Sequence, residues 1–239
     1  MTGPGLAAAV ARRALWRAVL TLMGGLRVDG EPALPAGPCV IVANHGSHAD
    51  TAALIAALPA RRQPAVAAAA DYWFRGSLRS AICRALCAAF PVRRTGGGSA
   101  DVAAAARLLA AGHDVIIYPE GTRSRDGQTG QFHRGAAGLA AAAGVPLVPA
   151  GISGTAALLP PGRATRRPRR VTVIVRIGAP VIIAELAERL VSDGGDAVAD
   201  ATGEARARVV ALLGAPQVPQ TTATGTRSPG RGLRRRRSG

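Results

Sequence analysis

After Gly30 the chain alternates short apolar runs with alanine-rich stretches, and this alternation restricts the folds that it can adopt. The runs PCVIVAN (38–44) and DVIIYPE (114–120) are short and continuous, as are strands buried on both faces of a sheet. The stretches between them are rich in alanine, the strongest helix former. Strands that alternate with helices are typical of a largely parallel sheet. We therefore expect an α/β fold with a central, mostly parallel sheet flanked by helices.

The same pattern gives approximate bounds for each element. Strands are expected at 38–44, 65–70, 90–94, 114–120, 145–153 and 171–178, and helices at 47–58, 77–89, 99–111, 135–143, 183–191 and 197–213. Ser47 is placed to cap the first of these helices, and Asp50 adds a carboxylate to its first turn. Gly112 and Gly144 are expected to end two others.

The length of the chain leaves room for one domain with appendages. Its 239 residues can form one sizeable core. We expect a helix within residues 1–30, the α/β domain over 31–213 and a disordered basic tail over 214–239. The tail has no acidic residue and little apolar surface to bury, which favours disorder. Its arginines are either solvated or a tether to an anionic membrane.

The segment LAAAVARRALWRAVLTLMGGL (6–26) predicts an amphipathic N-terminal helix. Arginines interrupt it, so no apolar stretch reaches the ~20 residues that cross a bilayer, and a cleaved signal peptide is disfavoured for the same reason. One face of the helix carries the apolar side chains of Leu15, Val19, Leu22 and Met23. This face either packs on the domain or lies in a membrane surface, with Trp16 at the depth of the head groups.

The composition limits the partners that the chain can bind. It has 30 basic and 14 acidic residues, a formal net charge of +16, which favours polyphosphates, anionic lipid head groups or nucleic acid. Aromatic residues make up only 3%, so few side chains could stack on bases. We therefore expect no nucleic-acid partner, and keep an anionic membrane surface as a partner.

The cysteines are Cys39, Cys83 and Cys87, an odd number with no metal-ligand spacing to any histidine. This argues against a disulfide framework and against zinc, so we expect no metal site and a reducing compartment. Cys83 and Cys87 stand one helical turn apart and are interpreted as small core residues.

The stretch NHGSHAD (44–50) carries the first group of chemically active side chains. His45 and Asp50 flank an expected junction between strand and helix, where both can face one cleft. Such a pair supports general base catalysis, because the carboxylate orients the imidazole and stabilises the imidazolium. No G-x-S-x-G segment supplies a nucleophile, so the base would activate a hydroxyl of the substrate. No role is assigned to the remaining histidines, His48, His113 and His133.

The second group follows the clearest strand, in YPEGTRSRDG (118–127). Gly121 permits close approach of the backbone, Thr122 offers a hydroxyl, and Arg123 offers a two-pronged donor suited to phosphate. A pair of arginines (93–94) follows another strand. Because parallel strands end at one edge of the sheet, we expect these groups and the His–Asp pair to converge on one anionic substrate.

In this order and spacing the segments resemble the glycerolipid acyltransferases of the 1-acylglycerol-3-phosphate type. NHGSHAD is similar to the N-H-x-x-x-x-D block of that family, FPVRR to its arginine block, YPEGTRS to its F-P-E-G-T-R-S block and VPLVPAG to its proline-containing block. The resemblance spans about residues 36–156. It implies the family's α/β fold and transfer of a fatty acyl group, without a cofactor, from an acyl-CoA or acyl-carrier-protein thioester. The implied acceptor is the hydroxyl of a lysophospholipid, above all 1-acyl-sn-glycerol-3-phosphate, which would give phosphatidic acid.

The resemblance also implies a role for each matching residue. His45 would be the general base and Asp50 its partner. The acceptor side would comprise Arg94, Glu120, Gly121, Thr122 and Arg123. Arg93 stands where many members have an acidic residue, so either arginine of this pair could bind phosphate. Pro146 falls in the block associated with the acyl donor.

Other interpretations of the sequence lead to different classes of protein. An acyltransferase of this type would work at the cytoplasmic face of the cell membrane, as a peripheral or monotopic protein. The acceptor could instead be another lysolipid or polar molecule. A serine hydrolase acting on lipid esters would need a nucleophile that the motifs do not supply. A basic membrane-binding or nucleic-acid-binding module would need no catalytic base.

Overall fold

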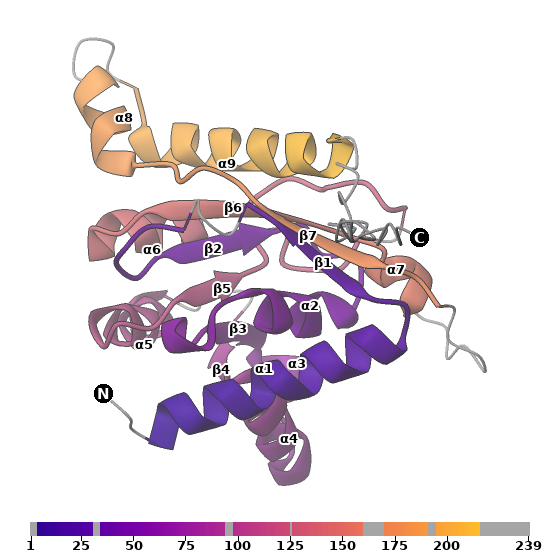
Figure 1. Ribbon diagram of the computed structural model, residues 1–239. Helices are drawn as coiled ribbons and strands as arrows, with labels where there is room; N and C mark the ends of the chain where they lie inside the picture. The colour runs from indigo at the N-terminus through magenta and orange to yellow at the C-terminus, as the bar shows by residue number, and fades with distance from the viewer. Residues whose placement is uncertain are drawn as a thin grey trace, which may run out of the picture.

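A seven-stranded sheet forms the centre of the molecule, in a computed structural model that describes residues 4–30, 34–93, 98–124, 126–159, 170–190 and 195–215 (Figure 1). The strands are β1 (Leu26–Asp29), β2 (Val40–Ala43), β3 (Ala65–Ala69), β4 (Ala89–Val92), β5 (Val115–Ile117), β6 (Leu147–Ser153) and β7 (Val173–Ile177). Their order across the sheet is β1-β7-β6-β2-β5-β3-β4. Neighbours are parallel, except that β7 runs antiparallel to β6.

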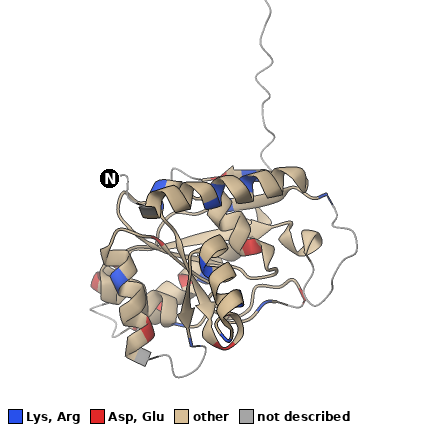
Figure 2. Cartoon of the chain, turned by 90° about the horizontal axis from the view of Figure 1, so that it is seen from below, with Lys and Arg blue, Asp and Glu red and all other residues tan. Residues whose placement is uncertain are grey.

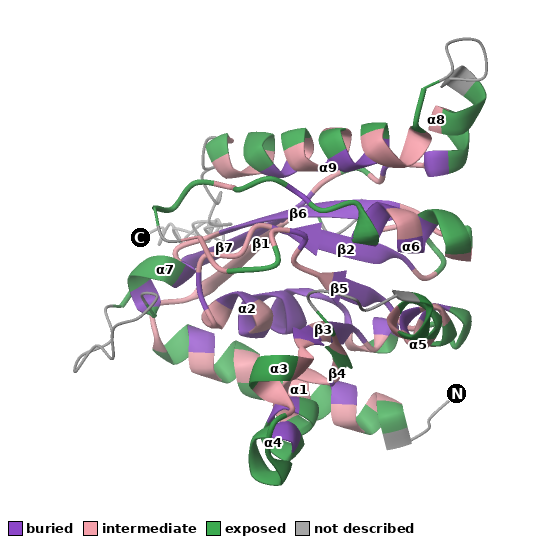
Figure 3. Cartoon of the chain, turned by 180° about the vertical axis from the view of Figure 1, so that it is seen from behind, coloured by how far each residue is buried: buried purple, intermediate pink, exposed green. Residues whose placement is uncertain are grey.

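Helices cover both faces of this sheet. They are α1 (Pro4–Leu22), α2 (Ala49–Ala57), the short 3-10 turn η2 (Ala60–Arg62), α3 (Ala70–Trp73), α4 (Ser77–Cys87), α5 (Gly98–Ala110), α6 (Gly135–Ala143), α7 (Thr155–Leu158), α8 (Ile183–Leu190) and α9 (Ala197–Gly214). Helices α1 and α2 lie on one face, whereas α8 and α9 lie on the other (Figure 1). The strands in the middle are buried on both sides (Figure 3).

Each face of the sheet has its own apolar core. Ile41 and Leu54 belong to the core under α1 and α2, while Val40 and Leu139 belong to the core under α5, α6 and α9. Successive residues of β2 therefore serve opposite faces, as the period of a strand requires. The continuous apolar runs of the sequence follow from this arrangement, because no side chain of a central strand faces water.

The predicted α/β class is confirmed, and six of the seven strands overlap predicted segments; five lie within them, and β4 begins one residue early, at Ala89. The exception is β1, which pairs with β7 along the sheet's edge. The prediction placed the start of the domain at residue 31, but the sheet already begins at Leu26. The sequence LRVD gave no sign of this strand, because it is short and half of it is charged. The α2 helix begins at Ala49, two residues later than predicted.

The N-terminal helix packs on the domain. Ala9 and Leu20 are buried, and the Trp16 indole N–H donates a hydrogen bond to the Leu86 carbonyl oxygen of α4 (2.8 Å). The apolar face predicted from the sequence is divided: Val19 and Met23 are partly buried, whereas Leu15 and Leu22 are exposed. Among the described helices, none is both long and apolar enough to span a bilayer. The predicted basic tail lies outside the described residues apart from its first two positions, which end α9 and its cap.

A buried ion pair ties together the amino ends of three central strands. The Asp114 carboxylate accepts hydrogen bonds from two guanidinium nitrogens of Arg62, each at 2.7 Å, and from the Cys39 N–H at 3.1 Å. Cys39 precedes β2, Asp114 precedes β5, and Ala65, the first residue of β3, donates its N–H to the Asp114 carbonyl oxygen. Burial raises the pKa of Asp114 more than these hydrogen bonds lower it, so the pair itself adds little stability.

Removing one partner of this pair should nevertheless lower the stability of the fold. Asp114→Asn leaves the buried Arg62 charge without a counter-ion, and we expect the free energy of unfolding in urea to fall by about 3–5 kcal/mol. The control is Glu204→Gln, which removes a carboxylate from a partly exposed pair with Arg208 on α9 and should cost less than about 1 kcal/mol. Equal losses in the two variants would contradict the structural role of Asp114.

Candidate functional site

A large cavity opens at the carboxyl ends of β2, β3 and β5. Its volume is about 1000 Å³, and most of its lining is apolar. Side chains of α1, α2 and α4 form one wall, and the segment that follows β5 forms another. The polar side chains that line it include His45, His48, Arg93, Arg123 and His133. The His45 segment and the segment after β5, predicted to converge, therefore do meet at this edge of the sheet.

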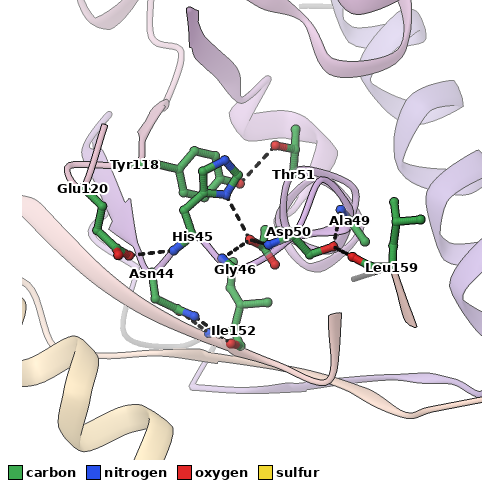
Figure 4. A network of polar contacts seen from close by, with 11 residues as sticks. Asn44, His45, Gly46, Ala49, Asp50, Thr51, Tyr118, Glu120, Ile152 and Leu159 are labelled. Atoms are coloured by element: carbon green, nitrogen blue, oxygen red, sulfur yellow. Dashed lines mark hydrogen bonds and ion pairs between the residues drawn. The ribbon is translucent and has the colours of Figure 1, made fainter. Parts of the chain in front are cut away.

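His45 and Asp50 form a hydrogen-bonded pair at the end of β2 (Figure 4). His45 Nδ1 lies 3.0 Å from Asp50 Oδ2; the Asp50 side chain is fully buried, and the His45 side chain is 18% exposed. In the neutral tautomer with the proton on Nδ1, the ring donates to this carboxylate and the Nε2 lone pair is free. The imidazole can therefore take a proton from a group in the cavity.

Backbone groups of the NHGS turn fix the Asp50 carboxylate. Oδ2 accepts the N–H groups of Gly46 and Ser47, each at 2.8 Å. The Ser47 hydroxyl oxygen in turn accepts the N–H of Ala49, the first residue of α2, at 3.1 Å. Ser47 and Asp50 therefore hold the turn that leads into α2, and Asp50 also fixes the direction of the His45 ring.

Asn44 anchors the other side of the turn to the neighbouring strand. Its side-chain amide donates to the Ile152 carbonyl oxygen (2.9 Å) and its side-chain oxygen accepts the Ile152 N–H (2.8 Å). This two-way contact joins the ends of β2 and β6. The only asparagine of the sequence therefore has a structural reason to stand beside His45, which the sequence analysis did not identify.

The Tyr118 ring packs against one face of the His45 imidazole. The two rings are stacked, with centroids 4.1 Å apart and planes 17° from parallel. The phenol oxygen lies 3.1 Å from the Thr51 hydroxyl on α2 (Figure 4). Burial and the nearby Asp50 carboxylate raise the pKa of Tyr118 well above its usual value, so the phenol stays neutral. The sequence did not predict that Tyr118 stacks on His45.

Glu120 braces the site with both carboxylate oxygens. Oε1 accepts the N–H of His45 (2.8 Å) and Oε2 accepts the N–H of Gly130 (2.9 Å). From α9, Arg206 in turn donates to the carbonyl oxygens of Thr129 and Gly130. Glu120 was assigned to the acceptor side by resemblance, and its observed contacts are to the protein backbone. It therefore positions His45 and the loop that follows.

Gly121, Thr122 and Arg123 all line the cavity beside this brace. Gly121 has a φ of +70°, and a β-carbon there would lie 3.5 Å from the His133 ring, so glycine suits the turn. Thr122 is exposed and Arg123 half-buried. A threonine hydroxyl and an arginine guanidinium therefore belong to residues at the cavity wall, and phosphate binding by them stays a prediction.

The arginines after β4 are only partly described. Arg94 lies outside the described residues, so the structure gives it no contacts. Arg93 lines the cavity, while its N–H (2.7 Å) and guanidinium (3.5 Å) donate to the Asp101 carboxylate. Its side chain is about half exposed. The choice between the two as phosphate ligand therefore stays open.

Pro146 is not brought to the cavity. It directly precedes β6, and its carbonyl oxygen accepts the N–H of Val40 at the start of β2. This places it at the edge of the sheet opposite His45, and it is absent from the described cavity lining. Its assignment to the acyl-donor side came from the resemblance alone, and the geometry does not support direct contact with a donor bound in this cavity.

Two histidines without an assigned role also reach the cavity. His48 stacks near Tyr72 and meets the edge of Trp73, with centroid distances of 6.3 and 5.4 Å. Burial first, then Arg123 and His45, lower the pKa of His48, which favours its neutral form. His133 donates its backbone N–H to the Pro119 carbonyl oxygen and faces Gly121. Within the described ranges no cluster of three or more His, Cys, Asp or Glu could hold a metal ion.

Comparison with known proteins identifies a family for this chain. The model of the Acyltransferase family matches residues 25–153. A 1-acyl-sn-glycerol-3-phosphate acyltransferase of Chlamydomonas reinhardtii is 45% identical over 74 residues, 30% of this chain and 22% of the relative. The human 1-acyl-sn-glycerol-3-phosphate acyltransferase alpha is 35% identical over 129 residues, 52% of this chain and 45% of the relative. The chain thus matches less than half the length of these curated relatives.

A solved structure shares the fold. The crystal structure of the 1-acyl-sn-glycerophosphate (LPA) acyltransferase PlsC from Thermotoga maritima superposes with a TM-score of 0.67. The superposition covers 88% of this chain and 81% of the other, at 23% sequence identity. This likeness confirms the fold class predicted from the sequence.

The brace formed by Glu120 can be tested through stability. In Glu120→Gln one carboxylate oxygen becomes an amide N–H₂, which must face either the His45 or the Gly130 N–H and leaves one of them unpaired. We expect the free energy of unfolding in urea to fall by about 1–3 kcal/mol. The matched control, Glu188→Gln on the exposed side of α8, should change it by less than about 0.5 kcal/mol. An unchanged stability of Glu120→Gln would show that the brace is not needed.

Proposed function

This chain belongs to the Acyltransferase family, and on that basis we propose that it transfers a fatty acyl group from a thioester to the free hydroxyl of a lysophospholipid. The proposed acceptor is 1-acyl-sn-glycerol-3-phosphate, the substrate that appears in the names of the relatives, and the product is phosphatidic acid. The observation that carries the proposal is the pairing of His45 with the buried Asp50 beside a large apolar cavity.

The chemistry needs one base and no covalent enzyme intermediate. His45 Nε2 takes the proton of the acceptor hydroxyl as its oxygen attacks the thioester carbonyl carbon. Asp50 stabilises the imidazolium that forms. The tetrahedral intermediate collapses when the carbon–sulfur bond breaks, and the imidazolium returns its proton to the thiolate. The products are an ester and a free thiol, and the base is regenerated.

The cavity has a polar side and apolar walls, which match the polar and apolar parts of such substrates. Thr122 and Arg123 stand at its polar side, where the guanidinium can donate two hydrogen bonds to a phosphate. The apolar walls between α1, α4 and β3 suit a fatty acyl chain. The donor is acyl-CoA or an acyl-carrier-protein thioester, used as a co-substrate without a further cofactor. The site of action is the cytoplasmic face of the membrane, where the protein would be peripheral or monotopic.

A panel assay tests the substrate class directly. Purified protein is incubated with lysolipids of different head groups and with acyl thioesters on CoA or on acyl carrier protein, and products are identified by mass spectrometry. The proposal predicts acylated product from the phosphate-bearing lysolipid. Product only from another lysolipid would correct the acceptor, and no product from any combination would reject acyl transfer.

His45 should be essential for turnover. Because a positioned base contributes about a hundred- to ten-thousand-fold, His45→Ala should lower kcat at least a hundredfold while circular dichroism stays unchanged. The control is His113→Ala, since His113 contacts the Gln63 carbonyl oxygen away from the cavity. It should retain normal turnover. Wild-type kcat in His45→Ala would exclude this mechanism.

Arg123 should contribute to acceptor binding through its positive charge and through two parallel hydrogen bonds. Arg123→Lys keeps the charge but cannot donate two parallel hydrogen bonds, so we expect the KM for the phosphate-bearing acceptor to rise about tenfold. The KM for the thioester should not change. Arg107→Lys, an exposed substitution on α5, serves as control and should leave both constants as they are. An unaltered acceptor KM in Arg123→Lys would identify Arg123 as an ordinary surface residue.

A further inference from the structure

The α4 helix presents its apolar side to solvent. Of its residues, Ser80 and Cys83 are buried, whereas Leu78 is 73% and Ile82 48% exposed. These two side chains stand one turn apart on the same side of the helix. Ala81 and Ala85 are exposed beside them, so the outward side is an apolar ridge. A surface helix of a soluble domain has the opposite arrangement, with polar residues outward.

Arginines flank this ridge on both sides. Arg79 and Arg84 stand about 100–120° around the helix from Leu78, in opposite directions. Their guanidinium groups lie over the rings of Tyr72 and Phe74, 5.3 and 5.2 Å from the centroids. Over residues 70–87 three arginines face one acid, Asp71, a net charge of 3 − 1 = +2. The cations are therefore anchored beside the apolar ridge.

The ridge adjoins the mouth of the cavity. Ile82 and Leu86 of α4 and Tyr72 and Trp73 of α3 all line the cavity, and Tyr72 is also 42% exposed at the surface. Figure 3 shows that most of α4 is exposed and that it projects from the body of the domain. Figure 2, from the side of α1 and α4, shows basic residues on the helices there. An apolar surface with a cationic border thus leads into the site.

We propose that the ridge of Leu78, Ala81, Ile82 and Ala85, with its flanking arginines, inserts into the head-group region of an anionic bilayer. Apolar side chains would enter the acyl boundary while Arg79 and Arg84 meet lipid phosphates. The charge complementarity favours a bilayer over a second copy of this basic chain, which the arginines would repel. That the bilayer delivers the acyl acceptor through this mouth rests on the proposed function, whereas binding itself does not.

Point substitutions of exposed residues on α4 test this proposal. Binding of the purified chain to phosphatidylglycerol-containing vesicles is measured by sedimentation without either substrate, so the result does not depend on whether the protein transfers acyl groups. Loss of an inserted leucine in Leu78→Gln should weaken partition roughly tenfold. Leu78→Trp should bind as tightly as the wild type or more tightly, because tryptophan favours the membrane interface.

The matched control lies on the other face of the sheet. Val210 of α9 is 44% exposed, so Val210→Gln also removes an exposed apolar side chain and should leave partition unchanged. Arg79→Gln should weaken binding about fivefold on anionic vesicles at low salt and have little effect at high salt. Far-ultraviolet circular dichroism confirms that each variant is folded.

Four outcomes would overturn the proposal. The wild type could fail to bind anionic vesicles, Leu78→Gln could bind as the wild type does, or Val210→Gln could lose as much affinity as Leu78→Gln. The fourth is a dimer in sedimentation velocity that Leu78→Gln dissociates, since the ridge would then join two copies of the chain.

Discussion

A buried carboxylate must find hydrogen-bond donors, and the site of this protein is arranged around that requirement at Asp50. Oδ2 takes the N–H groups of Gly46 and Ser47 and the Nδ1 proton of His45. These donors belong to three consecutive residues, 45–47, and the acceptor Asp50 ends the same short segment, NHGSHAD. Once the carboxylate is buried at the start of α2, the imidazole has one tautomer and one direction. The direction of the His45 ring is therefore set by contacts within its own segment of the chain.

The remaining contacts hold this turn against its neighbours in the sheet. Asn44 joins it to β6, Glu120 joins it to the segment after β5, and Tyr118 covers one face of the imidazole. Each contact comes from a strand that ends at the same edge, so the parallel order of β5, β2 and β6 brings the parts together. The segment YPEGTRS therefore positions His45, in addition to lining the cavity.

The sequence predicted the buried strands and the site residues better than it predicted the contacts between them. Buried strands such as β2 and β5 have continuous apolar runs, which can be recognised without a partner. The strand β1 could not be recognised in this way, because LRVD forms a strand through its pairing with β7. His45 and Asp50 are close in the chain and were paired correctly in space, whereas the contacts of Glu120 with Gly130 and of Tyr118 with His45 depend on tertiary structure. Pro146 was grouped with the site by the resemblance, but it stands before β6 and therefore lies at the edge of the sheet away from His45.

The buried ion pair and the cavity lie at opposite edges of the same sheet. The Arg62–Asp114 pair joins the amino ends of β2, β3 and β5, while the cavity occupies their carboxyl ends. A change at the cavity therefore leaves the contacts of Arg62 and Asp114 in place, although Glu120, which braces the backbone at the cavity, still contributes to stability. Residues 121–123 line the cavity without bracing it in this way, so their side chains can vary in evolution without removing a contact at the opposite edge.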